Sequence, residues 1–419
     1  MARVKITVEL DNGDITEIEQ ELSEGSLETF DQIEDFALSA RRALFPKLQE
    51  QLLSKSQIAF KKKEGFTSNG TRTISINGID GSVLFGLQRY KLGGDFFKST
   101  HQFALGLESS RLKAWIKEEV QQKSYRNVSK SLEMLTGEVV YSPNQVREKV
   151  KIYAQEVTQH QIKTYYGIQL CLPFSESKID LYDSQAEEIH LFDDGIGVKK
   201  QKKSRVLGYE KQQKTVQTDL IEIQNPTGSF DYITAGYGVK NWDIETAVLC
   251  WISLNYGNNR LPLVAITDGA RDIRLRLWRI FGGQVVIILD WYHLQKKMRE
   301  LCSMVAFGKT HKEEILAVIS PLLWEGKVDK VVTYLEDIKP RNVKKHQEII
   351  EYLLKHKAEI IDYKKRKEAK KTIGSGRAEK RVDLVVAQRQ KNKPIAWSKD
   401  GSHALSVLKA HQLNIRMAA

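Results

Sequence analysis

The sequence is poor in cysteine: its 419 residues include three, Cys171, Cys250 and Cys302. Three widely separated cysteines argue against a disulfide framework and against a cysteine-rich zinc site. A reducing cytoplasm therefore suits the chain.

Long hydrophobic runs are also missing. No run approaches the roughly 18 apolar residues that a membrane span needs. The N-terminus, MARVKITVELDNGD, alternates like a strand and lacks an apolar core segment, so we expect no signal peptide. The sequence shows no internal repeat.

Acidic residues are too few to balance the basic ones. The sequence has 65 Lys and Arg against 53 Asp and Glu, which gives a net charge of +12 and a pI of about 9.3. Such a balance favours a polyanionic partner, and DNA or RNA ahead of a membrane surface. The alternative is a basic enzyme whose extra lysines only solvate helix faces. Hydrophobic residues make up 41%, enough for buried cores, and the length suggests two or three domains.

The first 96 residues predict a small α+β module without an assigned role. Alternation over residues 1–15 predicts a strand, and helical spacing follows over 27–53. Pro46 is expected to kink or split that helix. Residues 58–95 alternate between glycines and predict further strands.

Residues 97–165 are expected to be helical and to contain a helix-turn-helix. Gly137 interrupts the helical pattern, and Ser142-Pro143 is a typical start for the next helix. A plain helical hairpin is the alternative. If the second helix binds DNA, Asn144, Gln145 and Arg147 face the groove, because recognition helices use their N-terminal residues.

A linker is expected over residues 166–186, and the alternation then becomes cleaner. The pattern predicts the order β-β-β-α-β-α-β, which is that of the ribonuclease-H-like fold. The expected strands are 187–194, 215–224, 229–236, 262–267 and 285–290, with helices at 241–256 and 270–281.

The rest of the chain is predicted to be helical. The first part of the core is expected over residues 187–306, an all-helical insertion over 307–372, and the last core helix with a C-terminal segment over 373–419. Candidate helices before that last part are 291–306, 311–324, 326–337 and 340–362.

Three carboxylates stand at element ends in this arrangement. Asp194 and Asp268 follow strands one and four, which are neighbours in such a sheet, and Glu379 follows Gly374-Ser375-Gly376. Converging carboxylates are the ligands that Mg²⁺ prefers for phosphoryl transfer. Each Asp-Gly pair taken alone is more typical of a turn. Strand parity does not choose between Asp193 and Asp194; we prefer Asp194, because the following Gly195 permits close approach.

Four segments carry a resemblance to a known family: LFDDGIGV, AITDGARDI, IILDWYHL and IGSGRAEKRVDLVVAQRQKNKPIAW. Together they span roughly residues 187–415. The chain resembles bacterial insertion-sequence transposases of the DDE class, in the branch with a helical insertion before the glutamate. Related transposases often carry a cysteine-rich zinc module near the N-terminus, but this chain has no cysteine before Cys171.

The resemblance implies a catalytic set of Asp194, Asp268 and Glu379 holding two Mg²⁺ ions, with Mn²⁺ as a substitute. It implies that Asp290 and His293 support the site; a helix-start histidine bonded to Asp290 and a direct DNA contact are the two interpretations of His293. Trp397 fits core packing better than base stacking.

The implied function is transposition in the bacterial cytoplasm, in association with the nucleoid. The protein would bind terminal inverted repeats and target DNA as a homodimer or larger assembly, and would cut and join strands. Expected phosphate contacts are Lys202, Lys203 and Arg377, although lysine-rich stretches are usually solvated faces. The rivals are a ribonuclease-H-like nuclease such as a junction resolvase, and an inactive DNA-binding remnant of a transposase.

Overall fold

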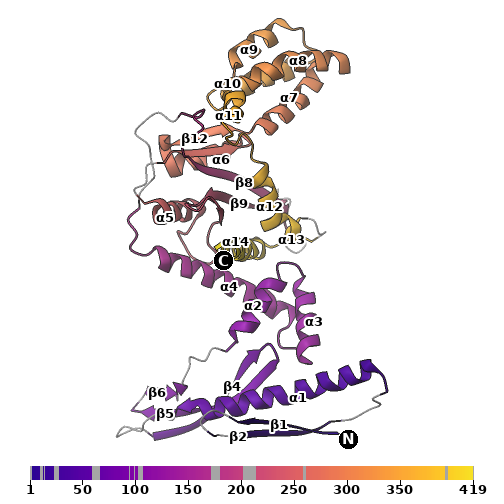
Figure 1. Cartoon of the computed structure of the whole chain (residues 1–419), viewed down its shortest axis with the longest axis vertical. Helices are drawn as coiled ribbons and strands as arrows, with labels where there is room; N and C mark the ends of the chain where they lie inside the picture. The colour runs from indigo at the N-terminus through magenta and orange to yellow at the C-terminus, as the bar shows by residue number, and fades with distance from the viewer. Residues whose placement is uncertain are drawn as a thin grey trace, which may run out of the picture. The chain divides into compact units, whose positions relative to one another are not determined.

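The structure is a computed structural model with two compact units, Met1–Val150 and Lys151–Ala419 (Figure 1). It describes residues 2–9, 13, 15–22, 28–58, 67–93, 95–98, 100–101, 107–170, 180–201, 214–257, 261–391 and 395–418. Within these ranges, the side chains at 56–58, 95–98, 100–101, 377–379 and 416–418 lie outside the description. The finer division expected from the sequence stays a prediction.

The N-terminal strand is a hairpin rather than one element. β1 (Ala2–Glu9) pairs antiparallel with β2 (Ile15–Leu22), so that Ala2 lies opposite Leu22. Gly13 lies between the strands with a φ of 82°. Glycine adopts this left-handed conformation without strain, which explains why the alternation continues on a second strand.

α1 (Phe30–Ser56) packs against β2 and against β5 (Gly81–Leu92). β5 is the central strand of an antiparallel sheet with β4 (Thr67–Gly78) and β6 (Asp95–Lys98). Pro46 lies inside α1 and does not split it, contrary to one of the two sequence expectations.

The range expected to be helical from residue 97 begins with strands. β6 extends to Lys98, and β3 (Gln57–Ile58) pairs with β7 (Thr100–His101). The aromatic pair Phe96-Phe97 explains the difference, because aromatic residues favour the pleated surface of a sheet.

Three helices follow: α2 (Ser110–Glu119), α3 (Tyr125–Thr136) and α4 (Pro143–Tyr165). α3 ends at Gly137, whose φ of 81° is typical of a left-handed helix cap. Ser142 and Gln145 bond each other's backbone N–H at the start of α4, at 3.4 and 2.8 Å. This reciprocal cap fixes where α4 begins.

The second unit is built on a five-stranded mixed sheet in the order β10-β9-β8-β11-β12. β8, β9 and β10 form antiparallel pairs, whereas β11 runs parallel to both β8 and β12. The strands are β8 (Ile189–Lys199), β9 (Thr215–Gln224), β10 (Phe230–Ile233), β11 (Leu263–Thr267) and β12 (Val285–Leu289). Four of the five lie close to the ranges predicted from alternation. β8 continues five residues beyond the predicted end at Asp194, because residues 195–199 go on pairing with β9, so the expectation that Asp194 ends its strand is wrong.

Both faces of the sheet are buried, in separate apolar clusters. α5 (Ile244–Tyr256) and α6 (Arg271–Phe281) cover the face that includes Leu191 and Ala265. Phe192 and Ile266 point to the other face and pack with the helices that follow β12. Successive residues of β8 therefore belong to different layers, as the period of two requires.

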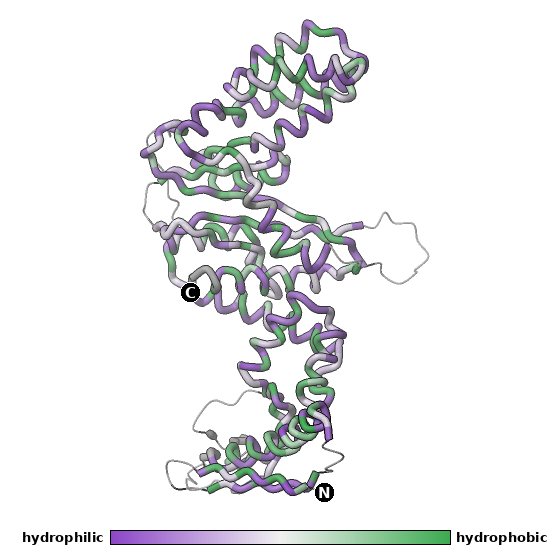
Figure 2. The backbone as a smooth tube through the Cα atoms, turned by 45° about the vertical axis from the view of Figure 1, so that its right-hand side comes forward, coloured by the Kyte–Doolittle hydropathy of each residue, from purple (hydrophilic) through white to green (hydrophobic). Residues whose placement is uncertain are grey.

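Five helices follow β12, and we call residues 291–372 the α7–α11 segment. They are α7 (Trp291–Val305), α8 (Lys309–Trp324), α9 (Val328–Asp337), α10 (Val343–Lys355) and α11 (Tyr363–Glu368). Along these helices hydrophobic and polar residues alternate in short steps, as expected for helices with one buried face (Figure 2).

One helix expected in this segment is two. The sequence predicted 340–362, but α10 ends at Lys355 and α11 begins only at Tyr363. His356 is 1% exposed, and Ile360 and Ile361 are also buried. The helix ends here, and the residues that follow it are buried: Ile360 and Ile361 join the core formed by the α7–α11 helices.

The C-terminal part returns to the sheet. α12 (Gly376–Val382) packs on β8, and α14 (Lys399–Ala418) packs on β9 and β10. A π-helical stretch (Asp383–Ala387) and α13 (Gln388–Gln390) connect them. Trp397 is 5% exposed and its indole N–H donates to the Gln390 carbonyl at 3.0 Å, so the core interpretation of Trp397 is confirmed.

A buried ion-pair network joins the α7–α11 segment to the start of β8. Arg366 is fully buried and contacts the Glu188 carboxylate and the Leu181 and Thr372 carbonyls. Two more side chains contact the Glu188 carboxylate: Lys371 Nζ lies 3.0 Å from it and His190 Nε2 lies 2.7 Å from it. Burial alone would raise the pKa of Glu188, but His190 and Arg366 outweigh it and lower the pKa to about 2.

Two further sequence expectations bear on the described residues. Cys250 and Cys302 are free and buried; Cys171 lies outside the described residues. Among the described helices, none combines the length and the apolar content that a bilayer crossing needs.

Replacing Arg366 with Met should lower the free energy of unfolding by roughly 3 kcal/mol, because a buried carboxylate loses its main partner. Denaturant unfolding followed by tryptophan fluorescence measures this, since six of the seven tryptophans follow residue 150. Lys365→Met is the matched control, because the Lys365 side chain is 65% exposed, and should change stability by less than about 0.5 kcal/mol. Equal stability of the two variants would contradict the role given to Arg366.

Candidate functional site

Asp194 and Asp268 lie on the same face of the sheet. The parallel pairing of β8 and β11 runs from Leu263 with Ile189 to Ile266 with Phe192. Continuing this register by two residues sets Asp268 beside Asp194. Neighbouring strands are about 4.8 Å apart, so this register predicts that the two residues are neighbours at the end of β11.

The surroundings of the two carboxylates are partly open. Asp268 is exposed and Asp194 is half-buried. The Asp268 carboxylate accepts from the backbone N–H of Ala270 at 2.8 Å, and Asp194 accepts from that of Gly195 at 2.7 Å. Asp268 is therefore oriented by an Asp-Gly turn after β11, whereas Asp194 lies within β8, opposite Leu220 of β9.

Asp193 lies on the opposite face, although it is adjacent in sequence. It is 3% exposed, and Arg276 of α6 donates two hydrogen bonds to it, at 2.8 and 2.7 Å. Arg276 also pairs with Asp219 of β9 at 2.8 Å. Burial alone would lower the pKa of Arg276, but Asp193 and Asp219 raise it, so the guanidinium stays charged. Asp193 is thus part of a buried ion pair between α6 and the sheet.

Asp290 ties three elements together where β12 ends. One carboxylate oxygen accepts from the backbone N–H of Tyr292 at 2.6 Å and of His293 at 2.9 Å, and so caps α7. The other oxygen accepts from the backbone N–H of Ser375 and from its hydroxyl at 2.5 Å. The Asp290 backbone N–H donates to the Thr267 carbonyl at 2.8 Å. Asp290 therefore holds the 374–376 loop against the end of β11.

The pKa of Asp290 reflects these donors. Burial alone would raise it, but hydrogen bonds from His293 and Ser375 outweigh burial and lower the pKa to about 2. His293 Nδ1 lies 3.7 Å from the carboxylate. This geometry agrees with the interpretation of His293 as a helix-start histidine beside Asp290.

Glu379 is carried by α12, which begins directly after Ser375 and packs on β8. The backbone thus brings its helix to the strand that contains Asp194. The side chains of Glu379 and Arg377 lie outside the described residues. Among the described side chains, to which Glu379 does not belong, no three His, Cys, Asp or Glu groups gather as a metal site.

A residue pair that the sequence did not reveal supports the Asp268 turn. His356 Nδ1 lies 2.6 Å from the Glu359 carboxylate, and Arg274 of α6 reaches the same carboxylate at 2.6 Å. Gly269 has a φ of 81°, and a Cβ there would lie 2.7 Å from Leu289 and 3.0 Å from His356. The Asp-Gly signal was visible in the sequence. The histidine 87 residues later was not, because no local pattern links the two.

A small cavity of about 300 Å³ opens beside Asp268. It is lined by His293, Lys296 and Lys297 of α7 and by Tyr352 of α10, among others. Burial raises the pKa of Tyr352 to about 12, and the charges of Asp268 and Glu359 add to this. Lys296, Lys297 and the neutral phenol can contact phosphate groups, and Glu300 is a second carboxylate in the lining besides Asp268.

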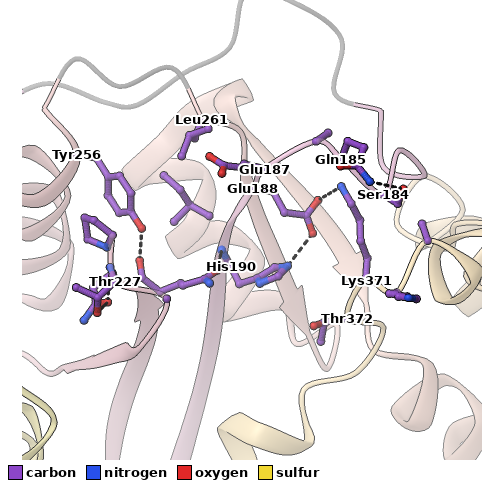
Figure 3. A pocket seen from close by; sticks show the side chains of 18 of the residues that line it. Ser184, Gln185, Glu187, Glu188, His190, Thr227, Tyr256, Leu261, Lys371 and Thr372 are labelled. Atoms are coloured by element: carbon purple, nitrogen blue, oxygen red, sulfur yellow. Dashed lines mark hydrogen bonds and ion pairs between the residues drawn. The ribbon is translucent and has the colours of Figure 1, made fainter.

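A larger cavity of about 730 Å³ lies at the other end of β11, away from Asp268. It surrounds the Glu188 network, and Figure 3 shows Lys371 and His190 reaching Glu188 from two sides. Tyr256 borders it and donates to the Gln224 carbonyl at 2.6 Å. The sequence-predicted site residues are not among its lining residues.

The expected DNA contacts are distributed over both units. Asn144, Gln145 and Arg147 are exposed on the first turns of α4, and Arg147 pairs with Glu148 at 3.1 Å. Lys202 and Lys203 lie outside the described residues. The role of these five residues stays a prediction.

Comparison with known proteins gives little. No protein-family model matches the chain, and no curated protein matches it. Among solved structures, it is similar to the Drosophila P element transposase strand transfer complex, with 10% identity and a TM-score of 0.25. The similarity covers 76% of this chain and 81% of that chain. A likeness at this TM-score carries no argument about fold or activity.

Replacing Asp290 with Asn should preserve the cap of α7 but set an amide N–H₂ against the Ser375 donors. We expect the free energy of unfolding at pH 7 to fall by about 1–3 kcal/mol. The folded pKa of Asp290 is about 2, below its ordinary value of 3.8, so the carboxylate stabilises the fold above pH 4. That stabilisation disappears as the pH falls toward 2.

The difference between wild type and Asp290→Asn in denaturant midpoint should therefore narrow from pH 5 to pH 2. Asp400→Asn is a control, because Asp400 is exposed in the first turn of α14. A difference that is constant across this pH range would show that the Asp290 charge is not what stabilises the loop.

Proposed function

We propose that this chain is a Mg²⁺-dependent DNA transposase of the DDE class with a ribonuclease-H-like core. The observation that supports this most directly is the register of β8 and β11. Continued by two residues, it sets Asp194 beside Asp268 on one face of the sheet, and α12, which bears Glu379, packs on β8. The motifs around these three residues add the family resemblance.

The strand order supports the proposed core. Three antiparallel strands in a row, followed by two strands that cross over through α5 and α6, give the order β10-β9-β8-β11-β12. This is the arrangement expected of ribonuclease-H-like proteins from the sequence. The α7–α11 segment is then a helical insertion between the last strand and the helix of Glu379.

The geometry favours Asp194 over Asp193 as the first metal ligand. Asp193 is buried in a two-bond ion pair with Arg276, and using it as a ligand would deprive Arg276 of two hydrogen bonds and leave it only Asp219. Asp194 is half-buried on the face of Asp268. The oxygen-only donor set of Asp194, Asp268 and Glu379 suits Mg²⁺, with Mn²⁺ as a substitute.

Two such ions would supply Lewis-acid activation of an attacking hydroxyl and stabilisation of the leaving oxygen. The protein's own residues would do the rest. Asp290 holds the loop before α12 at a fixed position, and Lys296 and Lys297 offer positive charge to phosphate oxygens beside Asp268.

The proposed reaction has two steps of in-line substitution at phosphorus. In the first, water forms a P–O bond at the element's end, the P–O3′ bond breaks, and a 3′-OH is released. In the second, that 3′-OH attacks a target phosphodiester, and the target's 3′ oxygen leaves with a proton. Two ends must be joined together, so the working form would be a homodimer or larger.

Changing Asp194, Asp268 or Glu379 to Ala should abolish Mg²⁺-dependent strand cleavage, with a loss of at least about a thousandfold in rate. Asp193→Asn is the matched control: it should lower the unfolding free energy, yet retain cleavage at temperatures where it is folded. Gel analysis of a labelled duplex measures both. Cleavage by all three Ala variants, or loss of cleavage in a folded Asp193→Asn variant alone, would refute the ligand set.

A strand-transfer assay separates the proposal from its rivals. A transposase should join a pre-cut end with a free 3′-OH to a supercoiled plasmid, whereas a nuclease or resolvase should only cleave. An inactive remnant should bind DNA and do neither in Mg²⁺ or Mn²⁺. Cleavage without joining under all these conditions would favour the nuclease.

The exposed start of α4 should recognise the element's end if it works as a recognition helix. Arg147→Ala should weaken binding to a duplex with that end by roughly tenfold, and binding to random duplex far less. Lys163→Ala, at the other end of α4, is a charge-matched control. Equal weakening by both variants would favour a plain helical hairpin.

A further inference from the structure

α6 exposes a stripe of unusual composition. Arg271, Arg274, Leu275 and Trp278 follow one another at intervals of three, one and three residues, which places them on one side of the helix. Trp278 is 65% exposed and Leu275 is 47% exposed, although the opposite side of α6 is in the core. A large aromatic ring held outward beside arginines is costly in water unless something covers it.

The stripe forms one wall of a groove, which we call the α6 groove. Lys355, the last residue of α10, lies across from it, and the cavity between them is about 410 Å³. The lining residues are Arg271, Arg274, Leu275, Trp278 and Lys355. Three cations and no carboxylate line the groove in the part of the chain that the structure describes.

The cations of the α6 groove differ in how they are held. Arg274 is fixed from behind by Glu359, at 2.6 Å, which in turn contacts His356. Arg271 and Lys355 are exposed, and no carboxylate among the described residues pairs with either. The Glu359 charge is therefore matched by Arg274, whereas Arg271 and Lys355 have no paired carboxylate in the described part of the chain.

The α6 groove begins next to the proposed site. Arg271 is three residues after Asp268, and α6 rises about 1.5 Å per residue, so Trp278 lies roughly 10 Å further along the helix. That length accommodates two to three nucleotides of a single strand, with phosphates near Arg271 and Lys355 and a base on the Trp278 ring.

We propose that the α6 groove binds a single nucleic-acid strand as it leaves the carboxylate site, with a base stacked on Trp278. The inference rests on the proposed function for the identity of the polyanion. The alternative is that a second copy of this chain covers the exposed Trp278 and Leu275 side chains. Charge favours the nucleic-acid strand over a second copy, because the groove of a second copy would place its own Arg271 and Lys355 against the same cations.

The test measures binding of a fluorescein-labelled 20-nucleotide single strand to the full-length protein in EDTA, so that no cleavage occurs. Trp278→Ala should weaken binding by roughly five- to a hundredfold, and Trp278→Phe, which keeps a stacking ring, should stay within about threefold of wild type. Arg271→Ala should reduce the slope of log affinity against log salt by about 0.7.

Arg279→Ala is the matched control on the same helix, because Arg279 pairs with Glu245 outside the α6 groove. Arg279→Ala should leave the slope of log affinity against log salt concentration nearly unchanged. If Trp278→Ala and Arg271→Ala bind like Arg279→Ala, the proposal is wrong. If Trp278→Ala turns a dimer into a monomer in sedimentation and binding is unaffected, the groove is a protein interface and the proposal is also wrong.

The groove proposal and the proposed function can be refuted independently of each other. The α6 groove is tested by binding without metal, whereas the carboxylate set is tested by cleavage with metal. Loss of cleavage in the Asp268→Ala variant together with unaltered binding in the Trp278→Ala variant would overturn only the groove.

Discussion

The position of the candidate site depends on the hydrogen bonds of one carboxylate, that of Asp290. It accepts from the first turn of α7 and from Ser375, and its own backbone donates to the end of β11. The chain thus leaves the sheet and returns to it at the same point. Four donors to one buried carboxylate are worth more than a surface ion pair, because each would otherwise be unsatisfied away from water.

Neighbouring aspartates on β8 have different physical roles because a strand turns each residue to the opposite face. Asp193 pairs with Arg276 and fixes α6 to the sheet, whereas Asp194 shares its face with Asp268. The two roles depend on each other. The ion pair holds α6 against β8, and α6 begins three residues after Asp268, so its placement also sets the Asp268 turn.

Much of the second unit could be predicted from the sequence, because its strands are short, apolar and separated by turn residues. The five strands and the helices α5 and α6 follow from periodicity alone. The end of α10 could not be predicted, because the burial of His356 depends on residues distant in sequence: Gly269 beside its ring, and Arg274, which pairs with its partner Glu359. Strand parity could not choose between Asp193 and Asp194, because both faces of β8 carry apolar residues and the partner Arg276 is distant in sequence.

The N-terminal unit followed its local pattern less closely. Alternation predicted a strand at residues 1–15 but not that the chain would turn back into β2, and the helical range began with β6 and β7. In each case a tertiary partner decided the local structure: β2 has α1 beside it, and β6 has β5.

The two ends of the α7–α11 segment meet at its base, which lets the helices between them differ among related proteins. Because Trp291 donates to Ile373 and Ser375 donates to Asp290, the two ends of the segment are joined to each other as well as to the sheet. Helices beyond that junction could be lengthened, exchanged or lost while α12 kept its place on β8. The outer helices of the segment can therefore vary in sequence without altering how its closed base meets the sheet.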